Sequence, residues 1–497
     1  MTDLSNLGCL DVPGWTGRVG GPAGRHSRVT KSSWFNPVPW TILASVFTWV
    51  VLMCRQVPCL PSTDHPYQRM CYSDIPVLFQ WKDMIWSGSA LYQNNPFGFW
   101  SSSAVLQDNP FDASKLQLEY PVLTSGFIWL GRWLAGLFGA TISMDASGSR
   151  RLAAANLFWG INSLLLFGCL GILVWSHLQM GRDSAAPHTG GVPIRAWDAL
   201  YIAASPVIML AGLINWDLLA VALTSVSILL WARRHPVWSG CLIGLAAAAK
   251  FYPLAMLAVL LILCLRSSRW KDFGLYIAGG AVAWTVVNLP TLLTAPQAWS
   301  YFWTYNAGRG PDLGSLWYVL TLMGVQIGNV SILEVVFITI SAGVITTMVI
   351  AAPRRPRVGQ VAMLVMVAFL AFNKVYSPQY VLWLLPLVVL ARPVLFDLLV
   401  FTVSESLYYL AVWGFLGGAL GIGTGPDRLY WLAVLFRVGV QLWLAGRVVR
   451  DIWQPWNDPV RGPFVDDPIG GVLNHAPDAG WLLRRTAETE PDEMNTE

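Results

Sequence analysis

Four charged residues in the polar stretches between apolar segments are candidates for chemistry. They are Asp74 in "CYSDIPVLFQW", Lys250 at the end of "GLAAAAK", Arg309 in "NAGRGPDLGSLW" and Lys374 in "NKVYSPQY". A positioned carboxylate can accept the proton of a hydroxyl group while that group attacks another atom. Fixed cations can stabilise the negative charge that develops on a leaving phosphate. An acid and several cations in one site would therefore suit the transfer of a group from a phosphate to a hydroxyl.

Each of these residues also has a purely structural interpretation. Ser73 or Asp74 before Ile-Pro is a good helix start, with an N-cap oxygen and a proline in the first turn. The apolar spacing that follows predicts an amphipathic helix lying on a membrane. A lysine at a helix end, such as Lys250, often only extends its ammonium group toward the headgroups. Asp217, which begins "DLLAVAL", is more easily explained as a structural residue.

The composition predicts a polytopic membrane protein. Of the 497 residues, 55% are hydrophobic and only 12% are charged, whereas a soluble domain carries about 25% charged residues. The 27 tryptophans suit long membrane–water boundaries, where indole rings concentrate. The net charge of +4 gives no indication of nucleic-acid binding. The fold class expected is therefore all-α, with helices that cross the bilayer.

Apolar runs that suit a bilayer core of about 30 Å organise the chain. We expect a cytoplasmic tail at 1–39, a transmembrane region at 40–450 with a first outer loop at 55–151, and a second cytoplasmic tail at 451–497. If the apolar runs 121–139 and 313–327 both span, the basic loops cannot all face the cytoplasm. With these two runs as re-entrant or surface helices, about 12 spans remain and both termini are cytoplasmic. The tail after Trp456 is rich in Pro, Gly and acids and is expected to be disordered.

In this orientation the polar stretches gather on the outer face, beside loops rich in aromatic residues. They are the loop 55–151, "INWD" (214–217), "AKFYP" (249–253), the loop 290–312 and "FNKVYSPQY" (372–380). Three cations on this face predict a site for a lipid-linked phosphate or pyrophosphate. Cys59 and Cys71 lie at or inside the first outer loop, where a disulfide between them is possible.

Polar residues gathered on one face are typical of an enzyme with a site there. A transporter more often buries its polar residues at mid-membrane in broken, repeated helices. A transporter or flippase of a lipid-linked sugar stays the alternative, because it could use the same phosphate site. A scaffold for other envelope enzymes would leave the cations on the outer face unexplained.

These stretches, in this order, resemble the polyprenyl-phosphate-dependent glycosyltransferases of the GT-C superfamily. The likeness is greatest to the actinobacterial mannosyltransferase-like members of glycosyltransferase family 87, the DUF2029 proteins. It rests on "YSDI", "EYPVLT", "NWDLLAVAL", "GLAAAAKFYP", "RGPDLGSLW" and "KVYSPQYVLWLLP", and it covers about residues 36–450. Each motif is loose alone, but the ordered set is fairly specific. Many members have Tyr-Pro-Pro where this chain has Tyr120-Pro121-Val122, so the geometry of this loop is expected to differ.

The resemblance implies a catalytic site on the extracytoplasmic side of the plasma membrane. It assigns the general base to Asp74 and the contacts with the donor phosphate to Lys250 and Lys374, to which the residue pattern adds Arg309. The candidates for binding the sugar or the acceptor are Glu119, Tyr120 and Asp217. Such enzymes invert the anomeric carbon and usually need no metal or other cofactor.

The partners expected are a polyprenyl-phosphate sugar as donor, an envelope glycan or glycolipid as acceptor, and the lipid bilayer. The donor sugar would be a hexose, most readily mannose. A pentose such as arabinose is a real variant, because the cations contact the phosphate and not the sugar. No nucleic-acid partner is expected.

Overall fold

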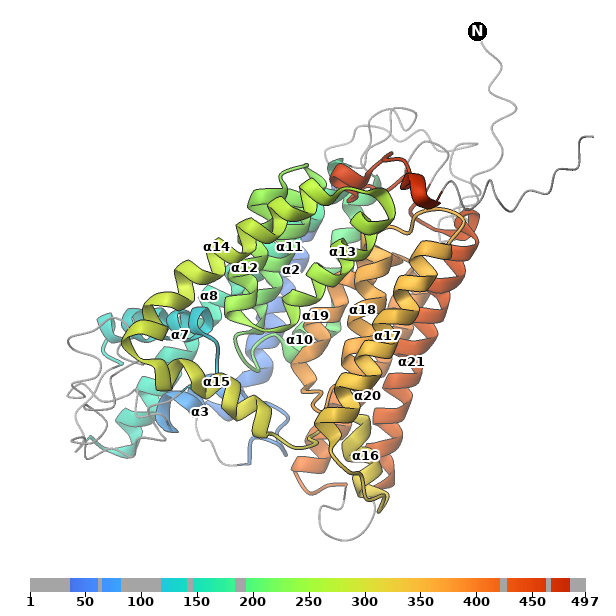
Figure 1. Ribbon diagram of the computed structural model, residues 1–497. Helices are drawn as coiled ribbons and strands as arrows, with labels where there is room; N and C mark the ends of the chain where they lie inside the picture. Colours follow the sequence, from blue (N-terminus) through green and yellow to red (C-terminus); the bar gives the residue numbers. More distant parts are fainter. Residues whose placement is uncertain are drawn as a thin grey trace, which may run out of the picture.

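Helices make up all the regular structure that the computed structural model describes (Figure 1). It describes residues 36–60, 65–81, 118–140, 146–183, 194–420, 427–461 and 466–482. Six of the helices are long and apolar enough to cross a membrane. They are α2 (Pro37–Gln56), α8 (Gly148–Asp183), α14 (Trp270–Thr294), α17 (Val330–Ala351), α20 (Leu395–Leu416) and α21 (Arg428–Trp453). The all-α polytopic fold expected from the sequence is confirmed.

Shorter apolar helices fill the centre of the bundle. They are α11 (Asp217–Ala232), α12 (Pro236–Ala249), α13 (Ala255–Ser267), α18 (Val358–Phe372) and α19 (Val381–Ala391). A broken segment adds a 3-10 turn (Ile194–Ala199), α9 (Leu200–Ala203) and α10 (Pro206–Ala211). Each apolar run that was expected to span coincides with one of these long, short or broken helical elements.

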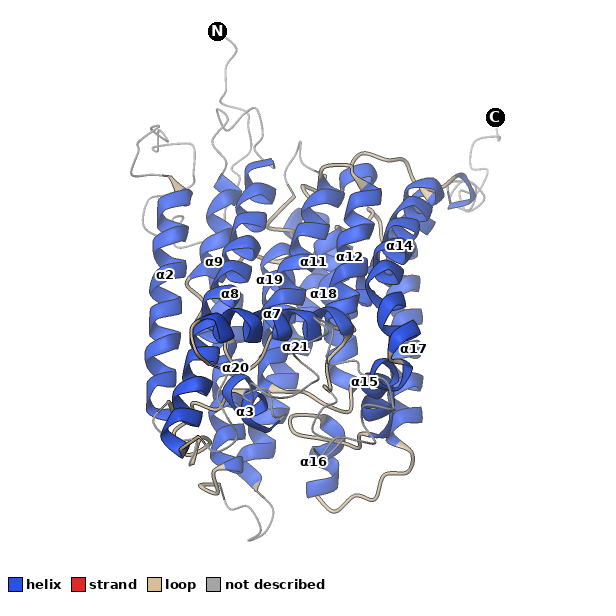
Figure 2. Cartoon of the chain, turned by 90° about the vertical axis from the view of Figure 1, so that its left-hand side faces the viewer, coloured by secondary structure: helices blue, strands red, loops and turns tan. Residues whose placement is uncertain are grey.

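The two apolar runs that were expected to form re-entrant or surface helices differ from the other runs in direction or in length. The first forms α7 (Val122–Leu137), which lies across the long helices and not along them (Figure 2). The second contains only α16 (Leu316–Leu322), and seven residues rise about 10 Å, too little to cross a bilayer. Two further short helices, α3 (Asp74–Trp81) and α15 (Pro296–Gly308), lie at the same end of the bundle as α16.

α12 packs closely on α14 because small residues lie at their contact. A Cβ added to Gly240 would stand 2.0 Å from the carbonyl oxygen of Tyr276, so a side chain there would push the helices apart. At the end of α12, the carbonyl of Ala249 accepts a hydrogen bond from the hydroxyl of Thr124 in α7 (2.6 Å). The next residue is Lys250, whose backbone is therefore fixed by two neighbouring helices.

Basic segments and polar stretches lie at opposite ends of the bundle. α11 ends and α12 begins on either side of the basic residues 233–235, and α18 begins directly after Arg357. The other ends of these three helices lead to Asp217, Lys250 and Lys374. We call the end of the bundle with residues 233–235 and Arg357 the basic end. The opposite end, with Asp217, Lys250 and Lys374, is called the cavity end.

The segment after α21 covers the basic end. Arg357, which is 1% exposed, pairs with Asp458 (2.8 Å), and Arg266, which is 2% exposed, pairs with Asp478 (2.7 Å). The tail was expected to be disordered, but residues 466–482 are packed against the helices because buried arginines need a counter-charge. The rest of the tail beyond them lies outside the described residues.

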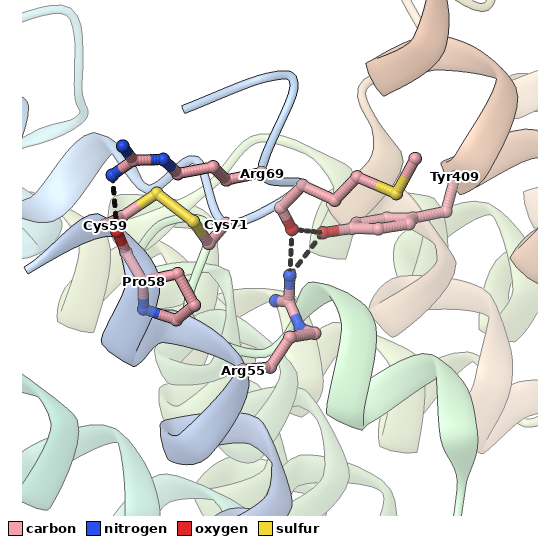
Figure 3. Close-up of a disulfide and its surroundings, with 7 residues drawn as sticks. Arg55, Pro58, Cys59, Arg69, Cys71 and Tyr409 are labelled. Atoms are coloured by element: carbon pink, nitrogen blue, oxygen red, sulfur yellow. Dashed lines mark hydrogen bonds between the residues drawn. A yellow bond between two sulfur atoms is a disulfide. The ribbon is translucent and has the colours of Figure 1, made fainter. Parts of the chain in front are cut away.

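A disulfide fixes the chain beside α3. Cys59, just after α2, and Cys71, just before α3, form the pair that the sequence made possible. Arg55, in the last turn of α2, donates to the carbonyl of Met70 and to the hydroxyl of Tyr409 (2.6 Å), as Figure 3 shows. The start of α3 is thus anchored both to α2 and to α20.

Candidate active site

A single cavity of about 690 Å³ at the cavity end contains most of the residues singled out from the sequence. Its lining includes Asp74, Glu119, Tyr120, Lys250, Arg309 and Lys374. These residues come from α3, the loop before α7, the end of α12 and the loops after α15 and α18. The structure therefore brings residues that are far apart in the sequence into one space, and Asp217 lies directly against Lys250.

The side chain of Asp74 is not needed to cap α3. The helix begins at Asp74, and the hydroxyl oxygen of Ser73 accepts a hydrogen bond from the backbone N–H of Ile75 (3.3 Å). The Asp74 carboxylate instead accepts a hydrogen bond from the hydroxyl of Tyr120 (3.0 Å) and one from Tyr72. Of the two cap candidates in the sequence, the structure uses Ser73, which leaves the carboxylate of Asp74 at the cavity.

The pKa of Asp74 is raised above the usual value of an aspartate. Burial is the largest cause, and the charge of Asp217 acts in the same direction, while the two tyrosine hydroxyls and the charge of Lys250 oppose it. A carboxylate with a raised pKa is a stronger proton acceptor than a free aspartate, provided that it stays ionised at the working pH. This environment suits a general base.

Lys250 lies between an acid and two aromatic rings. Its Nζ atom is 2.8 Å from Oδ1 of Asp217, whose other oxygen accepts a hydrogen bond from Trp383 (3.0 Å). The ammonium group also lies 5.4 Å from the ring centre of Tyr120 and 5.8 Å from that of Trp383, within the range of cation–π attraction. Tyr120 thus contacts Asp74 through its hydroxyl and Lys250 through its ring.

The other two cations are also held near acceptors. Arg309 donates from Nε to the carboxylate of Asp312 (3.0 Å). Lys374 donates from Nζ to the carbonyl of Ala307 (3.3 Å) and to the hydroxyl of Ser331 (3.2 Å). Both side chains are only partly buried, so a ligand in the cavity can reach them.

Several residues that line the cavity were not found from the sequence. Asp312, three residues after Arg309, and Glu334, an acid in the first turns of the apolar helix α17, line it. Gln379 is 7% exposed, and among the described residues its amide oxygen has no hydrogen-bond partner. Tyr305 of α15 hydrogen-bonds to Glu119. The sequence signal was present for Glu334, because an acid inside an apolar span is a functional candidate.

The acids of the cavity outnumber its cations. Among the described residues the lining carries three cations, already named, and four acids, Asp74, Glu119, Asp312 and Glu334; Asp217 adds a fifth acid beside Lys250. Close groups of three or more His, Cys, Asp or Glu, as a metal site would need, are not found in the part of the chain that the structure describes. The acids are therefore spread around the cavity, and Asp217 and Asp312 each hold one cation.

A model of a known protein family matches the middle of the chain. The family model of glycosyltransferase family 87 matches residues 146–373. This range contains Asp217, Lys250 and Arg309 and ends one residue before Lys374, while Asp74 precedes it. No curated protein matches the chain. The family match indicates a glycosyltransferase, over a shorter range than the resemblance of the motifs suggested.

Proposed function

We propose that this membrane glycosyltransferase, which resembles family 87 over residues 146–373, transfers a hexose from a polyprenyl phosphate to a glycan or glycolipid of the cell envelope. Mannose is the hexose that we favour. The observation that carries the proposal is Tyr120, whose hydroxyl contacts Asp74 and whose ring lies under Lys250. One side chain therefore links a candidate base to a candidate phosphate-binding cation across the cavity.

The chemistry follows from the two groups that Tyr120 connects. Asp74 removes the proton from the acceptor hydroxyl while the oxygen of that hydroxyl bonds to the anomeric carbon. The bond from the anomeric carbon to the phosphate oxygen breaks, and the lipid phosphate leaves with the electron pair. Lys250, with Lys374 and Arg309, stabilises the charge on that phosphate. Attack opposite the leaving group inverts the anomeric carbon in one step.

The excess of acids favours a donor of low charge. A sugar linked to a lipid through one phosphate is a phosphodiester with one negative charge, whereas a pyrophosphate link carries two. Each added negative charge is repelled by the acids of the cavity, at about 1–4 kcal/mol for a like-charged pair at contact distance near a protein surface. We therefore favour a monophosphate donor over a pyrophosphate donor or a sugar nucleotide.

We place the cavity end on the extracytoplasmic side. The disulfide between Cys59 and Cys71 supports this, because disulfides persist in oxidising compartments. The arginines at the basic end support it too, because basic loops concentrate on the cytoplasmic side. The cavity would then meet polyprenyl-linked donors whose sugar faces outward.

Gln297→Cys and Lys271→Cys test this orientation from the two sides of one helix. Both positions are exposed: Lys271 lies in the first turn of α14 and Gln297 lies three residues after its end, and the 25 residues of α14 rise about 37 Å. In a background with Cys9 and Cys54 replaced by serine, an impermeant thiol reagent applied to intact cells is expected to label position 297 only. Labelling of position 271 in intact cells, with none at 297, would reverse the orientation.

Tyr72→Phe is expected to move the acidic limb of the pH–rate profile to higher pH. The active base is the carboxylate of Asp74, which is lost as the pH falls through its pKa. The hydrogen bond from Tyr72 lowers that pKa, so its removal raises the pKa and activity is lost at a higher pH. The measurement is kcat/KM against pH. Tyr67→Phe is the control, since Tyr67 lines the same cavity and no hydrogen bond joins it to Asp74 in the structure; an equal shift in both variants would contradict the assignment.

Purified protein in lipid vesicles tests the activity itself. With labelled polyprenyl-phosphate mannose and an envelope lipid extract, we expect the label to move to an acceptor lipid or glycan, or to be released as free sugar. A flippase would leave the donor intact and change only the leaflet in which it lies. That outcome would contradict the proposed transfer.

A further inference from the structure

Two loops present the cations Arg309 and Lys374 to the cavity. We call residues 309–315 and 373–377 the cation loops. Neither contains a helix or a strand, so their conformation must be maintained by contacts with other parts of the chain. Those contacts decide where the two cations stand.

The backbones of the cation loops are bonded to each other. The N–H of Asp312 donates to the carbonyl of Lys374 (2.9 Å), and the N–H of Tyr376 donates to the carbonyl of Leu313 (3.1 Å). The two bonds run in opposite directions between the loops. A shift of one loop therefore moves the other, and the positions of both cations change together.

Side chains of α20 and α21 hold both cation loops from behind. The carbonyl of Gly314 accepts from Arg437 (2.7 Å), and its N–H donates to the hydroxyl of Tyr430 (2.8 Å). The carbonyl of Tyr376 accepts from the hydroxyl of Tyr408 (2.6 Å). Gly314 has a φ of +77°, and a Cβ there would stand 2.0 Å from the Tyr408 hydroxyl. Only glycine fits this contact.

A buried acid and a buried base complete this support. Glu405 of α20 accepts hydrogen bonds from the hydroxyl of Tyr376 (3.0 Å) and from the amide of Gln441 (2.7 Å). The guanidinium of Arg437 lies 3.3 Å from the ring centre of Tyr376. Glu405 is 3% exposed and Arg437 is 1% exposed. Charged groups inside membrane-spanning helices are costly and usually serve a function.

We propose that Glu405 and Arg437 are positioning residues that hold the cation loops, and so place Arg309 and Lys374 at the donor phosphate. This inference rests on the proposed function of the cavity. It concerns residues beyond the range that matches the family model, which ends at residue 373. Glu405 and Arg437 do not line the cavity, so they act through the loops and do not touch the donor.

The alternative is that this cluster only stabilises the packing of α20 on α21. Both roles predict a loss of stability when Glu405 is changed, because Arg437 would lose the charge of Glu405, which interacts with it inside the bundle. Only the positioning role predicts that donor binding changes in the protein that remains folded. The two roles therefore separate when stability and donor KM are measured on the same variants.

Glu405→Gln is the test and Asp397→Asn is its matched control. Asp397 is a buried acid of the same helix, paired with Arg392 at the basic end. Its neutralisation therefore also removes an acidic partner from a buried arginine. We expect both variants to unfold at lower temperature than the wild type. Glu405→Gln is expected to raise the KM for polyprenyl-phosphate mannose about tenfold, as partial loss of a charge-assisted contact would, while leaving the acceptor KM unchanged. Asp397→Asn should leave both KM values unchanged.

Tyr408→Phe covers the case in which Glu405→Gln does not fold. It removes only the hydroxyl that bonds the carbonyl of Tyr376 and introduces no unpaired charge. A severalfold rise in donor KM is expected, in the same direction as for Glu405→Gln. An unchanged donor KM in the folded variants, or an equal rise in Asp397→Asn, would overturn the positioning role.

The wild type and Lys374→Ala separate this inference from the proposed function. If the wild type neither binds nor cleaves polyprenyl-phosphate mannose, the proposed function is wrong. If the wild type acts on it and Lys374→Ala weakens donor binding, the proposed function stands. An unchanged donor KM in Glu405→Gln and Tyr408→Phe would then refute only the role of the buried cluster.

Discussion

Asp74→Asn is expected to fold, to bind the donor and to lose transfer by about 10²–10⁴-fold, the usual cost of losing a general base. The cap of α3 is provided by Ser73, so the helix start does not depend on the carboxylate. Asparagine keeps an oxygen that can accept a hydrogen bond from Tyr120, but its amide cannot take up the acceptor proton. The measurement is the single-turnover transfer rate at saturating donor.

Ser73→Ala is the control for this prediction. It removes the side chain that caps α3 and is expected to cost about 0.5–2 kcal/mol of stability, with little change in the rate of the folded protein. Loss of transfer in Ser73→Ala equal to that in Asp74→Asn would mean that both act by disturbing α3. A near-wild-type rate in Asp74→Asn would show that another residue is the general base, and Glu119 would be the next candidate.

Lys250→Met is expected to weaken both folding and donor binding, and a double variant separates the two effects. Removing one partner of a buried ion pair typically costs about 3–5 kcal/mol, because the other charge is left without compensation. Lys250→Met leaves the carboxylate of Asp217, whose side chain is 1% exposed, without its counter-charge. In Lys250→Met/Asp217→Asn both charges are gone, so most of the stability should return.

Donor affinity should not return in the double variant. A charge-assisted hydrogen bond to a phosphate contributes about 1.5–3 kcal/mol, which corresponds to a roughly 10- to 100-fold weaker donor affinity when it is lost. Thermal unfolding and donor binding are measured on the wild type, both single variants and the double variant. Wild-type donor affinity in a stable double variant would show that the pair between Lys250 and Asp217 is structural only.

The helices of this protein follow from local sequence, and this is why they were predictable. Apolar runs define them, and prolines such as Pro206 and Pro236 mark helix starts. The packing of α12 also follows from its small residues. The disulfide was only one possible outcome, because the spacing of Cys59 and Cys71 permits the bond without requiring it.

The partners of the site residues were less predictable, because they depend on contacts between distant parts of the chain. Lys250 and Asp217 are 33 positions apart and were given separate roles, yet they form one ion pair. Glu405 and Arg437 lie inside runs that were counted simply as spans, although an acid and a base in such runs are themselves a signal. The packed part of the C-terminal tail was missed because its composition suits disorder, while its acids are matched to arginines elsewhere.

The ion pairs at the basic end have a consequence for the order in which the protein is made. Arg266 and Arg357 are synthesised long before Asp478 and Asp458, which neutralise them. A chain still attached to the ribosome therefore holds these arginines without these counter-charges until the segment after α21 has emerged. The basic end can therefore be completed only after residues 458 and 478 have been made, and a chain cut short before residue 458 would leave Arg266 and Arg357 without these partners.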